Sequence, residues 1–126
     1  MKKKSIHNDI VEYLYHNPIV LNIHDEILEK QIEYEMRNGI NLYVVPDLYF
    51  HTLHNYFFFE IKSSHSKHCK EKGHLQMFRT YDWLQRHNNE IITRVTIGLV
   101  RPTTKRQKLD DIVRNLDVSY LVNNYI

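Results

Sequence analysis

The sequence predicts an α/β fold, in which a mixed central β-sheet is flanked by helices. The expected order is helix, three strands, helix and strand, followed by a C-terminal helix and a short strand. Three observations predict it: apolar residues recur at helical spacing in residues 5–16, strand-like alternation begins at Gln31, and residues 56–59 are all aromatic. The 126 residues are enough for one hydrophobic core, so we expect a single domain over residues 1–126.

The chain begins with a predicted helix over residues 5–16. Its apolar stripe consists of Ile6, Ile10, Val11 and Leu14, and Asn17-Pro18 is a helix stop signal. Residues 18–22 are predicted to be extended. A short helix is then expected to run through Leu28, with Asn22 or Asp25 as its cap.

A β-hairpin is predicted next. Ile32, Tyr34 and Met36 alternate with polar residues, and Asn38-Gly39 is a strong hairpin signal. Residues 40–45 then form the return strand. Pro46 lacks a backbone N–H, so it bends the path after the hairpin.

Two further strands follow the hairpin, over Leu48–Phe50 and Tyr56–Lys62, with a turn at residues 51–55. The aromatic start of the second strand predicts that both of its faces are covered. Because side chains alternate along a strand, Glu60 and Lys62 project to the same face. Two charges at the end of a buried strand are costly unless the protein uses them.

The second half of the chain contains two predicted helices and two strands. Residues 63–72 are polar and predict a loop, and residues 73–87 predict a helix. The apolar stripe of this helix consists of Met77, Phe78, Tyr81 and Leu84, with Gln76, Arg79 and Trp83 off the stripe. A strand follows over Ile91–Val100.

The last helix is expected after Pro102, with Thr103 or Thr104 as its cap. Its apolar side consists of Leu109, Ile112, Val113 and Leu116. Residues 118–122 predict a short final strand.

Composition excludes several classes of protein. Hydrophobic residues make up 42% and charged residues 25%, which are globular values, so disordered and fibrous classes are excluded. No apolar run approaches the roughly 20 residues that cross a bilayer. The single cysteine, Cys69, cannot form an internal disulfide, and we expect a soluble protein in the cytoplasm. The chain has no alanine and many residues with AT-rich codons, which is typical of an AT-rich genome such as a viral one; for a viral protein, the location would be the host cytoplasm.

Charge is distributed unevenly along the chain. Residues 61–108 contain eleven Lys or Arg against three acids, a net charge of +8, whereas the whole chain has a formal charge of +2. This segment predicts a polyanionic partner such as nucleic acid. A solvated charged surface remains the alternative.

Asp47 and Glu60 are the candidate metal ligands, because the predicted strands place their carboxylates a side-chain length apart. Such a pair suits Mg²⁺ or Mn²⁺, which lower the pKa of bound water and neutralise charge on phosphate. Lys62 would steady the nucleophilic water or the transition state. The same pattern also arises by chance, as an Asp at a turn and a surface Glu-x-Lys.

Pro46-Asp47 and Glu60-Ile61-Lys62, on these elements, resemble the PD-(D/E)xK nuclease superfamily over residues 5–100. The resemblance implies a restriction-endonuclease-like core, with Asp47 and Glu60 as metal ligands and Lys62 as the catalytic lysine. It further implies an acid on the first helix. Glu12 is the match, although Glu29, Glu33 and Glu35 compete with it.

Gln76 resembles a glutamine that RecB-like members carry on the helix after the motif, whereas Tyr81 is spaced one residue too far and is assigned to the core. The layout is most similar to the archaeal and viral Holliday-junction resolvases, which are homodimers. Their glycine- and serine-rich stretch before Pro46 is missing here, so junction specificity stays open. DNA nucleases of defence or mobile elements fit nearly as well.

The sequence therefore predicts a DNA endonuclease that requires Mg²⁺ or Mn²⁺, acts on branched or duplex DNA and forms a homodimer. The residues expected to contact DNA phosphates are Lys67, Lys70, Lys72 and Arg79. Three histidines and the cysteine also raise the alternative of a zinc site: His65, His68, Cys69 and His74. Their spacing matches no standard zinc finger, and a histidine-rich polar loop is the simpler interpretation. A non-catalytic nucleic-acid-binding module and a small interaction protein are the remaining alternatives.

Overall fold

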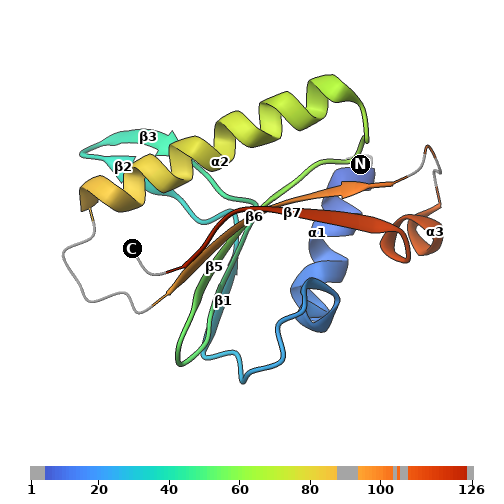
Figure 1. Cartoon of the computed structure of the whole chain (residues 1–126), viewed down its shortest axis with the longest axis horizontal. Coiled ribbons are helices and arrows are strands. Elements are labelled where there is room, and N and C mark those ends of the chain that lie inside the picture. The colour runs from blue at the N-terminus through green and yellow to red at the C-terminus, as the bar shows by residue number, and fades with distance from the viewer. Residues whose placement is uncertain (1–4, 88–93, 104, 106–107, 125–126) are drawn as a thin grey trace.

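The computed structural model describes residues 5–87, 94–103, 105 and 108–124 (Figure 1). A five-stranded mixed sheet, in the order β1-β4-β5-β6-β7, is flanked by helices, and β2 and β3 form a separate two-stranded sheet. The elements are α1 (Ile6–His16), the 3₁₀ helix η1 (Pro18–Leu21), β1 (Glu29–Ile32), β2 (Met36–Asn38), β3 (Asn41–Val44), β4 (Leu48–His51), β5 (Tyr56–Ile61), α2 (Lys67–His87), β6 (Val95–Pro102), α3 (Leu109–Val113) and β7 (Leu116–Asn124). The predicted α/β class with a central mixed sheet is confirmed.

One parallel pair interrupts an otherwise antiparallel sheet. β1, β4 and β5 pair antiparallel, β5 and β6 pair parallel, and β6 and β7 pair antiparallel. A parallel pair requires a crossover connection, and α2 provides it between β5 and β6. The residues that follow β5 therefore enter this helix.

The sheet is covered on both faces, and each face has its own core. Phe59 and Ile61 of β5 pack with Ile10 and Leu14 of α1. Phe58, between them in sequence, lies in the other core, which contains Met77 and Leu84 of α2. Figure 1 shows α2 and the β2–β3 hairpin on one side of the sheet and α1 on the other. The prediction that the aromatic strand is buried on both faces is confirmed.

The first helix forms where the sequence predicted it, and the segment after it does not. Ser5 caps α1 by accepting a hydrogen bond from the Asn8 N–H. Residues 18–21 form η1 instead of an extended segment, because Pro18 favours the first helical turn. Asn22 then adopts a left-handed conformation with φ 62° and ends that turn. No helix runs through Leu28, so that prediction was wrong.

The hairpin turn at Asn38-Gly39 is confirmed, with Gly39 at φ 63°. The long strand predicted before it was wrong, because it is divided in two. Glu33 has φ 55°, a left-handed conformation that interrupts a strand. Residues before Glu33 form β1, which joins β4 in the main sheet, and residues after it form β2, which pairs with β3.

Helix α2 begins at Lys67, six residues before the predicted start at Gly73. Ser66 caps it, because its Oγ accepts a hydrogen bond from the Cys69 N–H at 3.2 Å. Most of the predicted loop over residues 63–72 is therefore helical. Within the helix, Phe78 is 56% exposed and Thr80 is buried in its place, because the buried face follows Gly73, Met77, Thr80 and Leu84.

The C-terminal elements differ from prediction mainly at their ends. β6 extends to Pro102, and residues 91–93 of the predicted strand lie outside the described residues. Lys108 precedes α3, instead of Thr103, and Thr104 is outside the described residues. Leu116 begins β7 instead of ending the helix. Within the described residues, no helix is both long and apolar enough to pass through a membrane.

Candidate active site

The structure brings Asp47 and Glu60 together at one end of β4 and β5. Leu48 pairs with Phe59 in the antiparallel ladder, so the residue before Leu48 lies beside the residue after Phe59. The Ile61 N–H donates to Asp47 Oδ2 at 2.8 Å, and the Asp47 and Glu60 side chains share a hydrogen bond. These contacts fix Asp47 against the end of β5.

The bend that presents Asp47 is held by the backbone around Pro46. The Glu33 N–H donates to the Asp47 carbonyl, and the Tyr34 N–H donates to the Pro46 carbonyl, both at 3.0 Å. The left-handed Glu33 therefore turns the chain at the same place where it docks on the Asp47 segment. The strained backbone of Glu33 therefore helps to hold Asp47 in its position.

The two carboxyl groups have opposite protonation tendencies. Glu60 is 7% exposed; burial, the negative charge of Asp47 and their hydrogen bond raise the pKa of Glu60 to about 9. Burial also opposes ionisation of Asp47, but hydrogen bonds from His7, Ile61 and Glu60 hold its pKa below the usual range. At neutral pH and without a cation, these directions favour a protonated Glu60 that donates a hydrogen bond to the Asp47 carboxylate.

Lys62 lies beside this pair. Its Nζ is 3.6 Å from Glu60 Oε1, and its side chain is 18% exposed. The Lys62 N–H donates to the Val100 carbonyl, which extends the β5–β6 ladder past the end of β5. Arg101, the residue after Val100, donates to the His65 carbonyl at 3.1 Å. This bond ties the loop that follows Lys62 to β6. The ammonium group thus stands at the edge of a fixed backbone.

His7 is the residue of this site that the sequence did not indicate. It lies in the first turn of α1, with Nε2 3.4 Å from Asp47 Oδ2, and the hydrogen bond to Asp47 raises the pKa of its imidazole. The contact joins residues forty positions apart and depends on how α1 packs on the sheet. No motif or spacing in the sequence predicts such a contact.

Glu12 lies elsewhere on α1. It is exposed and lines a cavity of about 400 Å³ together with Asn8, Asp9 and Glu33. The other two acids that compete with Glu12 are also engaged or distant: Glu35 forms an ion pair with Arg37 at 2.8 Å, and Glu29 lies in β1 opposite His51. None of these four side chains lies against Asp47 in the contacts of the described residues.

Gln76 lies on α2, one turn after Gly73, which packs against Leu99 of β6. Its side chain is half-buried, and its Oε1 has no hydrogen-bond partner among the described residues. Arg79 packs on the β2–β3 hairpin, with its guanidinium over the Tyr43 ring and 4.8 Å from the ring centre. The three lysines predicted to contact DNA are exposed at the start of α2: Lys67, Lys70 and Lys72.

The described residues contain no group of three or more His, Cys, Asp or Glu side chains arranged to hold a metal ion. The zinc site considered as an alternative is therefore not formed among the described residues. His68 and Cys69 lie in the first turn of α2, not in a loop. The Asp47–Glu60 pair nevertheless fits Mg²⁺ or Mn²⁺ chemically. Mg²⁺ keeps several waters and binds through one or two carboxylates. A bound cation would also displace the proton that the raised pKa of Glu60 otherwise keeps on that carboxyl group.

The site therefore consists of the buried carboxyl group of Glu60, the partly buried one of Asp47, a lysine at their edge and a histidine behind them. Together they form a hard-oxygen donor pair with Lys62 on one side and His7 on the other. Comparison of the chain with protein families, with curated proteins and with solved structures finds no match.

Proposed function

We propose that this chain is an endonuclease that hydrolyses phosphodiester bonds in DNA with Mg²⁺ or Mn²⁺, through a PD-(D/E)xK site on a restriction-endonuclease-like core. The observation that carries the proposal is the meeting of Asp47 and Glu60 at the ends of adjacent strands, with Lys62 3.6 Å from Glu60. Two carboxylates and a lysine in this arrangement suit hydrolysis of a phosphate ester.

Each residue has a separate role in this proposal. Asp47 and Glu60 hold the ion, which when bound acts as a Lewis acid and lowers the pKa of its water. The Ile61 N–H orients Asp47. Lys62 positions the attacking water and stabilises negative charge that develops on the phosphate oxygens. His7, through its contact with Asp47, is a positioning residue or an additional ligand.

The start of α2 is the proposed DNA contact. Lys67, Lys70 and Lys72 are exposed and follow Lys62 closely in the chain. Phosphate contacts from lysines position a duplex without reading its sequence. Because one site cuts one strand, cutting of a duplex or a junction requires two copies, and we propose a homodimer.

A cleavage assay tests the proposal directly. Purified protein is incubated with a four-way junction, a flap, a linear duplex and a single strand, each in Mg²⁺, Mn²⁺ or EDTA. We expect metal-dependent cutting that Asp47→Ala and Glu60→Ala reduce by about 10²-fold or more, because each removes a ligand that stabilises the transition state. Glu26→Ala, an exposed acid outside the site, is the control. Cutting that survives Asp47→Ala would refute the assignment.

The pattern of substrates distinguishes the narrower alternatives. Preference for the four-way junction, with symmetrical cuts, supports a resolvase. Equal cutting of linear and branched DNA supports a general nuclease of defence or mobile elements. Both outcomes require the same Asp47 and Glu60.

A non-catalytic DNA-binding module is the second candidate. The raised pKa of Glu60, about 9, favours it, because a carboxyl group that stays protonated at neutral pH is a poor metal ligand. This candidate predicts DNA binding that weakens with salt and no cutting in any metal. Calorimetric titration of the chain with Mn²⁺ separates the two candidates before any cleavage is measured.

A further inference from the structure

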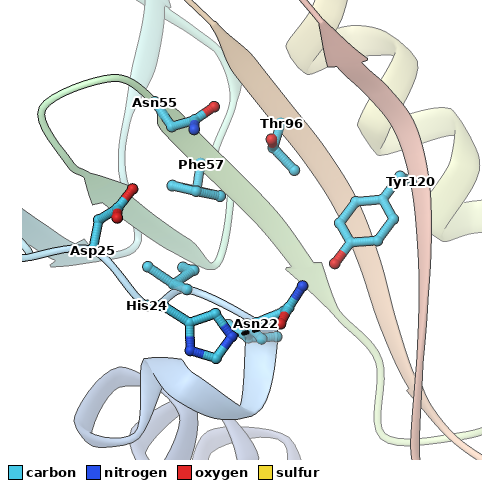
Figure 2. A pocket seen from close by; sticks show the side chains of 9 residues that line it. Asn22, His24, Asp25, Asn55, Phe57, Thr96 and Tyr120 are labelled. Atoms are coloured by element: carbon cyan, nitrogen blue, oxygen red, sulfur yellow. Dashed lines mark hydrogen bonds between the residues drawn. The ribbon is translucent and has the colours of Figure 1, made fainter.

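A second cavity, of about 300 Å³, lies at the end of the sheet where β5 and β6 begin (Figure 2). Phe57, Thr96 and Tyr120 line it from three neighbouring strands, and residues 21–25 line it from the end of η1 and the segment after it. Phe57 and Glu60 point to opposite faces of β5. Phe57 also lies about 13 Å along the strand from Ile61, whose N–H binds Asp47. The cavity is therefore separate from the Asp47–Glu60 site.

Two aromatic rings border the floor of this cavity. Phe57 lies on β5 and Tyr120 on β7, so the backbones of their strands are about 9.6 Å apart. Gly98 of β6 pairs with Tyr120 and lacks a side chain; the Phe59 ring fills the space above it, 2.8 Å from where a Cβ would stand, and the Tyr120 ring lies 3.5 Å from the same point. A flat aromatic ligand in the cavity can contact the lining rings of Phe57 and Tyr120.

Two amide side chains supply the polar edge. Asn22 Oδ1 bonds His24 Nε2 at 2.7 Å, as the dashed line in Figure 2 shows, and the Asn22 nitrogen carries two N–H donors. Asn55 also lines the cavity, and its buried Oδ1 has no partner among the described residues. A buried acceptor without a donor is unfavourable, so a ligand N–H would stabilise it after a small rotation of the amide. Amides offering both donors and acceptors match the edge of a nucleobase.

The charges around the cavity indicate whether a nucleoside or its phosphate ester fits. Among the residues that the structure describes, no lysine or arginine lines the cavity, whereas the Asp25 carboxylate does, on the side away from Tyr120 (Figure 2). A carboxylate accepts hydrogen bonds from the hydroxyls of a ribose and repels a phosphate. The volume lies at the lower end of the range of about 300–1,000 Å³ that is usual for ligand pockets.

We propose that this cavity binds a ribonucleoside, with the base against the aromatic rings and the amides, and the ribose at Asp25. The ligand is either a free nucleoside or an unpaired unit of an RNA strand, because both offer the same base and ribose. The proposal does not rest on nuclease activity. It uses other residues, on the other face of β5.

Titration of the full chain tests the proposal. Adenosine, guanosine, cytidine and uridine are each titrated by calorimetry and by ligand-observed NMR, together with their 2′-deoxy forms and 5′-monophosphates. We expect at least one nucleoside to bind 1:1, with a Kd between about 1 μM and 1 mM. We expect its 2′-deoxy form to bind about fivefold or more weakly, because a hydroxyl bonded to a carboxylate is lost. No binding up to about 1 mM, or tighter binding of the 5′-monophosphate, would overturn the proposal.

Two exposed residues provide the variants. Asp25→Asn is expected to remove the preference for ribose over deoxyribose, and Tyr120→Leu to weaken the nucleoside about tenfold, because an aromatic stacking partner is lost. Asp110→Asn on α3 is the matched control and should bind normally. Thermal unfolding shows whether each variant folds. Binding that neither variant changes would place the ligand elsewhere and refute the assignment.

Two further measurements identify the source and separate the proposals. If a short single-stranded RNA displaces the nucleoside and binds more tightly than the nucleoside does, the natural ligand is an unpaired unit of an RNA strand. If the RNA fails to displace the nucleoside, the natural ligand is the free nucleoside. Asp47→Ala should leave nucleoside binding unchanged, since Asp47 lies outside this cavity. Loss of binding in that variant would contradict a separate site.

Discussion

Glu60 and Asp47 are neighbouring carboxyl groups whose surroundings push their pKa values apart. Asp47 receives hydrogen bonds from His7, Ile61 and Glu60, whereas Glu60 is buried beside a negative charge. Such divergence is common at functional sites but also occurs in structural networks. The consequence at this site is that Glu60 carries a proton in the folded protein and loses it on unfolding at neutral pH.

This difference predicts how stability depends on pH. The Glu60 pKa is about 9 when folded and 4.5 in its ordinary state, so between these values the folded chain binds the extra proton. Stability from this group is therefore present below pH 4.5 and decreases as pH rises toward 9, by up to about 1.4 kcal/mol per pH unit. Denaturant unfolding between these pH values should show a shallower dependence in Glu60→Gln, whose amide still donates to Asp47. Equal slopes in both proteins would contradict the raised pKa.

His7 gives a second prediction at this scale. His7→Ala removes the contact to Asp47, so the pKa of Asp47 should rise and the free energy of unfolding should fall by about 1 kcal/mol. NMR titration of the Asp47 carboxyl carbon measures the first effect, and denaturant unfolding the second. His54→Ala, in the exposed β4–β5 turn, is the control. An unchanged Asp47 pKa would show that His7 does not stabilise the carboxylate.

Local pattern accounts for some of these residues and not for others. Asp47 and Glu60 meet because one antiparallel register pairs Leu48 with Phe59, and a short turn between two apolar runs makes that register predictable. His7 meets Asp47 only through the packing of α1 on the sheet. The amphipathic pattern shows which face of α1 is buried, but it does not show which sheet residues the ends of that face reach.

At the scale of elements, the predictions from sequence misplaced the ends of helices and strands where the side-chain pattern and the backbone geometry disagree. The first turns of α2 are basic and polar, so they carry no apolar stripe, although Ser66 caps them. The alternation from Gln31 to Met36 is real, but the left-handed Glu33 divides it between two sheets. A side-chain pattern does not report the φ of one residue.

The capping of α2 gives the prediction at this scale. Ser66→Ala removes the acceptor of the Cys69 N–H and should lower the free energy of unfolding by about 1 kcal/mol. Hydrogen exchange should increase most in the first turn of the helix, since the loss is local. Ser63→Ala, an exposed serine three residues earlier, should leave both measurements unchanged. If the two variants behave alike, Ser66 does not stabilise the start of α2.

For the whole molecule, periodicity was enough to predict the α/β class, because each element carries its own pattern of buried residues. It was not enough to predict the strand order β1-β4-β5-β6-β7 or the separation of the β2–β3 hairpin from the main sheet. Those features depend on pairing between distant segments, as between β1 and β4 or β5 and β6. Burial patterns identify strands without identifying their partners.

The uneven charge of the whole chain gives the last prediction. If Lys67, Lys70 and Lys72 contact DNA phosphates, the logarithm of the binding constant should fall steeply with the logarithm of salt concentration. Each phosphate contact contributes a slope of about 0.9, so replacing all three lysines by glutamine should reduce the slope by up to about 2.7. Fluorescence anisotropy of a labelled duplex, at several salt concentrations in EDTA, measures this without cleavage.

The control for that measurement changes net charge equally at exposed positions elsewhere: Lys105→Gln, Lys108→Gln and Arg114→Gln. General attraction by a positive protein would weaken binding to the same extent in both triple variants, because each loses three charges. A contact at the start of α2 would reduce the slope only in the first. The comparison therefore separates a defined DNA-binding surface beside Lys62 from a diffuse effect of charge.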